Sequence, residues 1–164
     1  ISGPSLTRFS LISRILEAIR DDESEIQYII SEGKPHGKTE PTKVSKSGWY
    51  YEWCPVKDEI YRLCDLVVMR AGHTAISQAI QYGKPVVTIP IQNQGEQLGN
   101  AAKVSKLGIG IKLDPSNMKA HEINAAIKEV LNNDYYLQNI NKIKVVAQDM
   151  NGIENVVNII RSYF

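Results

Sequence analysis

The stretch Leu66–Ile80, LVVMRAGHTAISQAI, decides the fold of this chain. It begins as an apolar strand, breaks into RAGHT (residues 70–74), and resumes at once as an amphipathic helix. A chain that needed only to turn could use Asn-Gly or Asp-Gly at this point. This chain instead places a cation, a flexible residue and a hydroxyl where a strand ends and a helix begins, which is where α/β proteins bind ligands.

Two strands near this stretch are apolar without the usual alternation. LVVM (66–69) and VVTI (86–89) show this pattern, which is typical of parallel strands covered by helices on both faces. Because strands also alternate with helices, the sequence predicts a doubly wound, Rossmann-like α/β domain with a parallel sheet. The expected helices are 7–20, 57–64, 74–82, 96–107, 118–132, 134–149 and 152 to about 163, and the expected strands are 26–30, a short one near 44, 49–53, 65–69, 85–90 and 108–113.

Length and composition limit the class of protein. A chain of 164 residues with 43% apolar content fits one globular domain that buries its own core. A net charge of +1 gives no support for nucleic-acid binding, and no apolar run approaches the roughly 18 residues of a membrane span. Cys54 and Cys64 are too few for a disulfide framework, which indicates reduced thiols and a cytoplasmic location. The opening ISGPS (1–5) has the pattern of a strand end and its loop, so we expect the C-terminal part of something longer.

The RAGHT segment could hold an anion. Gly72 lets the backbone approach a ligand closely, and the first N–H groups of the following helix favour negative charge. Arg70 can clamp phosphate oxygens and Thr74 can add a hydroxyl donor. An N-cap threonine and a solvated strand-end arginine are the structural alternative, and His73 is expected to be a second donor or a surface residue. No metal site is expected, because no cysteine or carboxylate lies at ligand spacing.

Two further stretches could carry recognition. In IPIQNQGEQLGNAA (89–102), Glu96 and Gln97 place a carboxylate beside a carboxamide, a pair that can bind vicinal hydroxyls. In EWCPVKDEI (52–60), Trp53 offers an aromatic face on which a base can stack. The structural alternatives are a helix-dipole role for the glutamate and a core position for the tryptophan.

Taken in order, these stretches resemble the donor-binding box of UDP-sugar glycosyltransferases of the GT-B fold. Plant members carry W-C/A-P-Q, then H-C-G-W-N-S-T-x-E, a G-x-P strand, and E/D-Q-x-x-N-A. The counterparts here are WCPV (53–56), RAGHTAISQ (70–78), GKP (83–85) and EQLGNA (96–101). The closer similarity is to family 28, whose R-S-G-A-L-T-V-S-E stretch parallels the second of these segments. The resemblance covers the chain well from Trp53 to Leu113.

The resemblance implies a role for each matched residue. Two positions depart from the family pattern: Gln78 replaces the usual glutamate, which removes a charge from the ribose site, and Val56 replaces a glutamine. The implied contacts are Trp53 with uracil; Arg70, Gly72, His73 and Thr74 with the diphosphate; Gln78 with the ribose diol; Glu96 and Gln97, in a motif completed by Asn100, with sugar hydroxyls; and, as a looser match, Ser5 and Thr7 with the diphosphate from the side.

These roles lead to the expectation of a nucleotide-sugar-binding domain of a hexosyltransferase, with a UDP-sugar as donor substrate and no cofactor. The acceptor and the catalytic residue are not identified, because GT-B enzymes place the acceptor site and general base on an N-terminal domain absent from this chain. One alternative is a non-catalytic donor-binding subunit of a split enzyme that docks on a partner at the cytoplasmic membrane face. Another is a related sugar-nucleotide epimerase. The last helix has an apolar face that could dock such a partner, although core packing is the expected use: Ile153, Val156, Val157 and Ile160.

Overall fold

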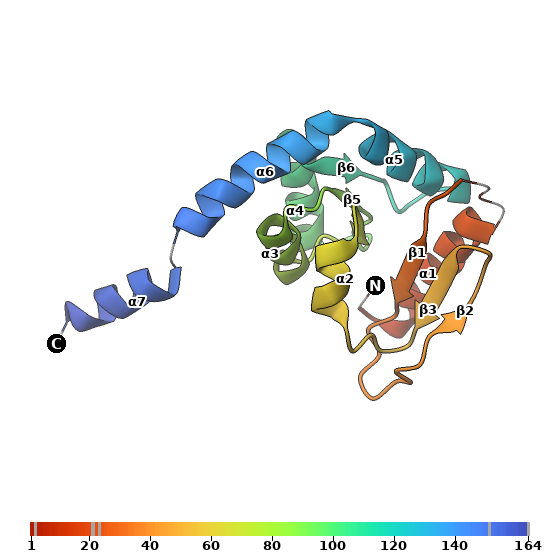
Figure 1. Ribbon diagram of the computed structural model, residues 1–164, viewed down its shortest axis with the longest axis horizontal. Helices are drawn as coiled ribbons and strands as arrows, with labels where there is room; N and C mark the ends of the chain where they lie inside the picture. Colours follow the sequence, from red (N-terminus) through yellow and green to blue (C-terminus); the bar gives the residue numbers. More distant parts are fainter. Residues whose placement is uncertain (2, 21, 23, 151, 164) are drawn as a thin grey trace.

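The strands of the protein form two three-stranded sheets, as seen in the computed structural model, which describes residues 1, 3–20, 22, 24–150 and 152–163 (Figure 1). The first sheet has the order β1-β3-β2, with β1 parallel to β3 and β2 antiparallel to it. The second has the order β4-β5-β6 and is parallel throughout. Their bounds are β1 Tyr28–Ser31, β2 Thr42–Lys43, β3 Gly48–Tyr51, β4 Val67–Met69, β5 Val86–Thr88 and β6 Gly110–Lys112.

The helices alternate with the strands as the sequence predicts, and the ends of all predicted helices and of the longer strands agree within two residues. The α3 helix ends at Gly83, whose φ of 69° is the left-handed conformation favoured by glycine after a helix. The helices are α1 Ser5–Arg20, α2 Lys57–Leu63, α3 His73–Tyr82, α4 Gly95–Lys106, α5 Ala120–Asn132, α6 Asp134–Asp149 and α7 Gly152–Arg161.

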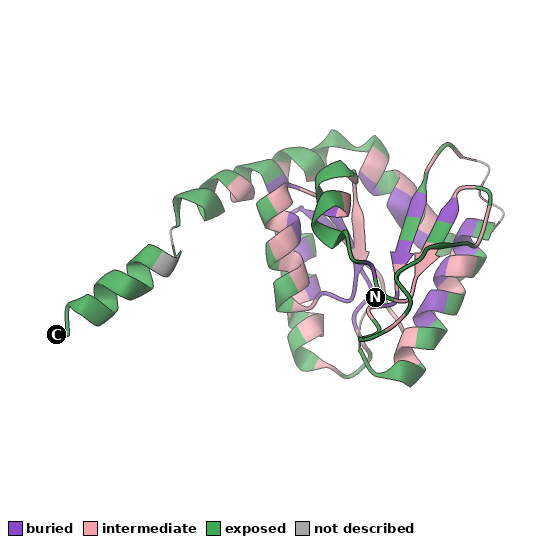
Figure 2. Cartoon of the chain, turned by 60° about the horizontal axis from the view of Figure 1, so that its bottom comes forward, coloured by how far each residue is buried: buried purple, intermediate pink, exposed green. Residues whose placement is uncertain are grey.

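The buried residues form two apolar clusters. The larger cluster joins α1 and α5 to β5, with Ile19, Val87 and Ile123 at its centre. The smaller cluster contains Val86 from the same strand together with Ile140 of α6. Consecutive residues of β5 therefore pack into different clusters, which explains why this strand is apolar without alternation. Figure 2 shows the buried residues gathered in the body of the domain, whereas the helices leading to the C-terminus are mostly exposed.

The long C-terminal helices depart from one expectation. Figure 1 shows α6 running away from the sheets, with α7 beyond it. Three residues expected in the core, Val156, Val157 and Ile160, are 55%, 37% and 53% exposed, so the prediction of core packing is wrong for them. The side chain of the fourth, Ile153, lies outside the described residues. The reason is the length of α6: its buried residue Ile140 lies in its first half, and the helix then continues past the body of the domain.

Candidate functional site

The turn between β4 and α3 leaves the start of a helix open. Ala71 is fully buried with a φ of 62°, a left-handed conformation that is uncommon for a residue with a Cβ. Gly72 follows as the N-cap of α3 and makes no side-chain capping bond. A Cβ built on Gly72 would meet no atom within 4 Å. The turn therefore leaves open space beside Gly72 at the carboxyl end of a parallel strand, and a helix that starts at such a place is suited to an anion.

Helix α4 is tied to this turn through two of the predicted residues. Glu96 Oε1 accepts the backbone N–H of His73 at 3.3 Å and the amide of Asn100 at 2.9 Å. The same Asn100 amide donates to the carbonyl of Ala71 at 3.1 Å. The structure thus brings Glu96, Asn100 and the start of α3 together, as the order of motifs suggests. The carboxylate of Glu96 already occupies part of the anion-binding geometry at this helix start.

Arg70 lies on the other side of the turn, against α1. Its guanidinium is buried, with 7% of the residue exposed, and it donates to the carbonyl and the hydroxyl of Thr7. Its Nε has no hydrogen-bond partner among the described residues. Burial lowers the pKa of Arg70, and the nearby Arg8 guanidinium lowers it further. Arg70 and Thr7 are therefore brought together as the sequence suggests, and an anion at this point would relieve the repulsion between two cations.

A buried carboxylate beside these cations was not anticipated from the sequence. Glu32, directly after β1, is 3% exposed and forms an ion pair with Arg8, with 3.1 Å between Nε and Oε1. The Tyr50 hydroxyl also donates to it. Burial and this carboxylate raise the pKa of Tyr50. The sequence did contain a signal: Glu32 comes directly after the strand YIIS (28–31), just as Arg70 comes directly after β4.

The remaining predicted residues are less closely connected. Trp53 lies beyond the end of β3, contrary to the predicted strand over 49–53. The residue is 44% exposed, and its backbone N–H donates to the carbonyl of Lys38. Gln97 uses its carbonyl to accept the Ile91 N–H at 2.9 Å, which holds the loop before α4. Three others are placed by their elements alone: Ser5 begins α1, and Thr74 and Gln78 lie in α3.

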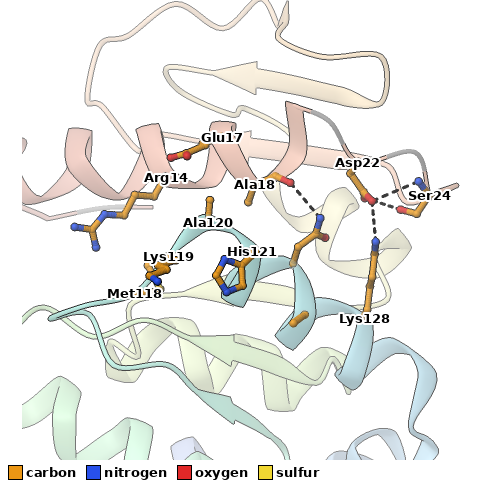
Figure 3. Close-up of a pocket in the computed structure, with 12 residues that line it drawn as sticks. Arg14, Glu17, Ala18, Asp22, Ser24, Met118, Lys119, Ala120, His121 and Lys128 are labelled. Atoms are coloured by element: carbon orange, nitrogen blue, oxygen red, sulfur yellow. Dashed lines mark hydrogen bonds and ion pairs between the residues drawn. The ribbon is translucent and has the colours of Figure 1, made fainter.

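A groove in the surface lies away from these residues. It is an open groove of about 1120 Å³ between α1 and α5, and none of the predicted site residues lines it (Figure 3). Its walls carry charges of both signs, including Arg14 and Glu17 of α1. Within it, Asn124 donates to the carbonyl of Ala18 at 3.1 Å, and Lys128 pairs with Asp22 at 2.9 Å. We interpret this groove as the surface furrow above the seam where α1 packs on α5.

Within the described part of the chain, no group of three or more histidine, cysteine or acidic side chains is arranged to hold a metal ion. In the same residues, none of the helices combines the length and the apolar character needed to cross a membrane.

The fold and the turn at α3 define a class: an α/β domain with a parallel sheet and an open helix start at the carboxyl ends of its strands. Residues 3–156 match the model of the glycosyltransferase family 28 C-terminal domain, so the chain belongs to this family. Among solved structures, it is similar to the glycotransferase of kitacinnamycin (TM-score 0.82, 17% identity, 99% of this chain and 40% of that one) and to the calicheamicin glycosyltransferase CalG4 (0.76, 16%, 94% and 38%). The fold is therefore that of the C-terminal half of a GT-B glycosyltransferase.

Curated relatives are similar in sequence over the same region. The UDP-N-acetylglucosamine–N-acetylmuramyl-(pentapeptide) pyrophosphoryl-undecaprenol N-acetylglucosamine transferase of Legionella pneumophila (strain Corby) is 29% identical over 151 residues, which are 89% of this chain and 40% of that protein. UDP-glucuronosyltransferase 1A8 of Rattus norvegicus is 28% identical over 112 residues, 68% of this chain and 21% of that protein. The chain thus spans less than half the length of these relatives.

Proposed function

We propose that this chain is the donor-binding half of a hexosyltransferase that uses a UDP-sugar. The observation that carries the proposal is the open start of α3, where Gly72 has free space and Glu96 and Asn100 approach from α4. The name of the Legionella pneumophila relative includes UDP-N-acetylglucosamine, and the Rattus norvegicus relative is named a UDP-glucuronosyltransferase. Both names agree with this assignment.

The proposed roles follow from position and chemistry. The N–H groups at the start of α3, with Gly72, His73 and Thr74, bind the diphosphate, and Arg70 approaches it from the side of α1 and Thr7. Glu96 gives up its bond to the His73 N–H when the phosphate arrives and then accepts from a sugar hydroxyl, as does the neighbouring Gln97. Trp53 stacks on uracil and Gln78 binds the ribose diol, with Ser5 beside the phosphates.

The rest of the reaction belongs to a second domain or subunit. We propose that the acceptor and the general base come from it, and that transfer proceeds by direct displacement with inversion at the anomeric carbon. The exposed apolar residues of α7, such as Val156 and Ile160, fit a surface that packs on this missing part. That part can be an N-terminal domain of the same polypeptide or a separate membrane-associated subunit. The chain alone then binds donor and transfers little sugar.

Calorimetric titration with UDP and with UDP-sugars tests the proposal. We expect micromolar to millimolar affinity, about −8 to −4 kcal/mol, because association costs offset much of the contact energy. Arg70→Lys should weaken both ligands at least tenfold, since a lysine cannot reproduce the fork of the guanidinium. Glu96→Ala should weaken the UDP-sugar more than UDP, because its proposed partner is the sugar.

Matched substitutions far from the site serve as controls. Arg161→Lys on α7 and Glu59→Ala on α2 make the same two changes at exposed positions and should leave both affinities unchanged. Circular dichroism confirms that each variant is folded. Absence of heat and of NMR shifts at millimolar UDP would refute the proposal.

A further inference from the structure

Glu32 is a buried negative charge near the proposed phosphate site, where a like charge opposes binding. It directly follows β1 and is 3% exposed. Its Oε1 lies 3.1 Å from Nε of Arg8, and the hydroxyl of Tyr50, on the neighbouring strand β3, donates to its Oε2. A buried carboxylate is costly unless it is paired, so Glu32 depends on these two partners.

Arg8 connects Glu32 to Arg70 through the loop before α1. Nη1 of Arg8 donates to the carbonyl of Gly3 at 3.2 Å. A Cβ built on Gly3 would lie 3.8 Å from Cδ and 4.0 Å from Nε of Arg70, so both arginine side chains reach the same loop residue. Burial lowers the pKa of Arg70 and the Arg8 guanidinium lowers it further, as expected for two cations that repel each other. The three charged groups therefore form one cluster.

This cluster is incompletely neutralised and open to an anion. It contains two guanidinium groups and one carboxylate, which leaves an excess of positive charge. Among the described residues, Nε of Arg70 has no hydrogen-bond partner, and Nε of Arg8 is ion-paired to Glu32 without a hydrogen bond. Residues 3–6 of the adjoining loop and helix start are exposed, so an anion can approach the cluster from solvent.

We propose that Glu32 is a built-in counter-anion: it holds the Arg8 guanidinium while the site is empty and yields it to the phosphates when a nucleotide binds. The proposal rests on the proposed function, which places phosphate beside Arg70. Glu32 acts through Arg8 and touches no ligand, so it is a positioning residue. It stabilises the empty protein, in which two neighbouring cations would otherwise repel each other. It also lowers the affinity for phosphate, because the ligand must compete with a carboxylate for Arg8.

Glu32→Gln distinguishes this role from a purely structural one. Glutamine has the shape of glutamate and keeps a hydrogen-bonding contact for Tyr50, but it lacks the charge. We expect the variant to melt at least about 5 °C lower than the parent chain. We also expect it to bind inorganic pyrophosphate and UDP at least threefold more tightly in calorimetry at pH 8, where the amino group of Ile1, with a pKa of about 6, is uncharged. A structural role alone would lower stability and affinity together.

Three variants control the comparison. Tyr50→Phe weakens the same cluster but keeps the charge of Glu32, so stability should fall with no gain in affinity. Glu25→Gln makes the same substitution at an exposed position before β1, at the other end of that strand, and should change neither quantity. Arg8→Gln combined with Glu32→Gln removes both partners of the ion pair, and the gain in affinity should vanish because the released guanidinium is absent.

The outcomes separate this proposal from the proposed function. An affinity of Glu32→Gln that is unchanged or weaker, an equal gain in Tyr50→Phe, or a gain that survives the loss of Arg8 would overturn the counter-anion. If UDP binds the parent chain in such a case, the proposed function stands. If pyrophosphate binds with the expected gain and UDP does not bind, the counter-anion is supported and the assignment of a UDP-sugar is wrong. Binding of neither ligand would overturn both.

Discussion

At the scale of single residues, the turn after β4 combines a constrained residue with an open one. Ala71 holds a left-handed φ of 62°, which costs roughly 1–2 kcal/mol for a residue with a Cβ. The amide of Asn100 holds its carbonyl in place at 3.1 Å. This conformation places the start of α3 beside open space, and Gly72, which has no side chain, leaves that space unfilled.

Gly72→Ala should separate binding from stability. The added methyl meets no atom within 4 Å and the φ of −65° suits alanine, so the free energy of unfolding should change by less than about 1 kcal/mol. The methyl would, however, occupy the space of the proposed diphosphate and reduce UDP affinity at least fivefold. Urea unfolding and calorimetry measure the two effects. Gly152→Ala, at the start of α7, also has open space and should leave UDP affinity unchanged; equal affinities in all three proteins would contradict the prediction.

The sequence predicts part of this turn and misses its surroundings. Arg70 and Glu96 can be found because each follows an apolar strand at a motif position. The ion pair between Arg8 and Glu32 could not be found, because it joins residues whose proximity depends on how α1 packs beside β1. The bond that the Ile91 N–H donates to Gln97 Oε1 was not foreseen either, because it depends on how the loop before α4 folds back onto that helix. The proposed contacts of these residues with a nucleotide sugar stay predictions.

At the scale of elements, one carboxylate links three of them. Asp22 follows α1 and accepts hydrogen bonds from Ser24 at 2.5 Å, from Tyr28 of β1 at 2.6 Å and from Lys128 of α5 at 2.9 Å (Figure 3 shows the bonds to Ser24 and Lys128). Burial raises its pKa, but the hydrogen bonds from these partners outweigh that effect and hold the pKa well below its usual range. The link therefore fixes the seam between α1 and α5 when Asp22 is ionised.

Asp22→Asn should weaken that link in a pH-dependent manner. Because the pKa of Asp22 is lower in the folded state, its stabilisation is present above about pH 4 and is lost as the pH falls further. We expect a loss of about 1–3 kcal/mol at pH 6 and a smaller difference from the parent chain at pH 3, measured by urea unfolding. Glu25→Gln, at an exposed position nearby, should have little effect at either pH. A difference that is the same at pH 6 and pH 3 would argue against the role of the charge.

The sequence predicts elements well where periodicity is strong. Apolar spacing places α3 over 74–82, one residue from its observed start, and the uninterrupted apolar run places β5. The position of α7 could not be predicted, because an apolar face looks the same whether it packs in the core or is exposed. That choice depends on the length and direction of α6, which only the fold shows.

At the scale of the whole molecule, the sequence predicts a doubly wound α/β domain, and the structure confirms this class, with its strands in two three-stranded sheets. The amino group of Ile1, which donates to the carbonyl of Ser31 at the end of β1, is buried beside charged side chains. Burial lowers its pKa from 8.0 to about 6, and the nearby guanidinium groups of Arg70 and Arg8 act in the same direction, with Glu32 opposing them. A charged ammonium in this place opposes folding, whereas a backbone amide would be neutral.

The chain 1–164 with a free amino group should therefore become more stable as the pH rises from 6 to 8. The unfolded state, with a pKa near 8.0, binds more protons in this window than the folded state, with a pKa near 6, so the free energy of unfolding increases with pH. Two pKa units correspond to at most about 2.7 kcal/mol. Urea unfolding at pH 5.5, 7 and 8.5 measures the trend. Acetylation of Ile1 removes the titrating group and should flatten it, and a slope that survives acetylation would assign the pH dependence to other groups.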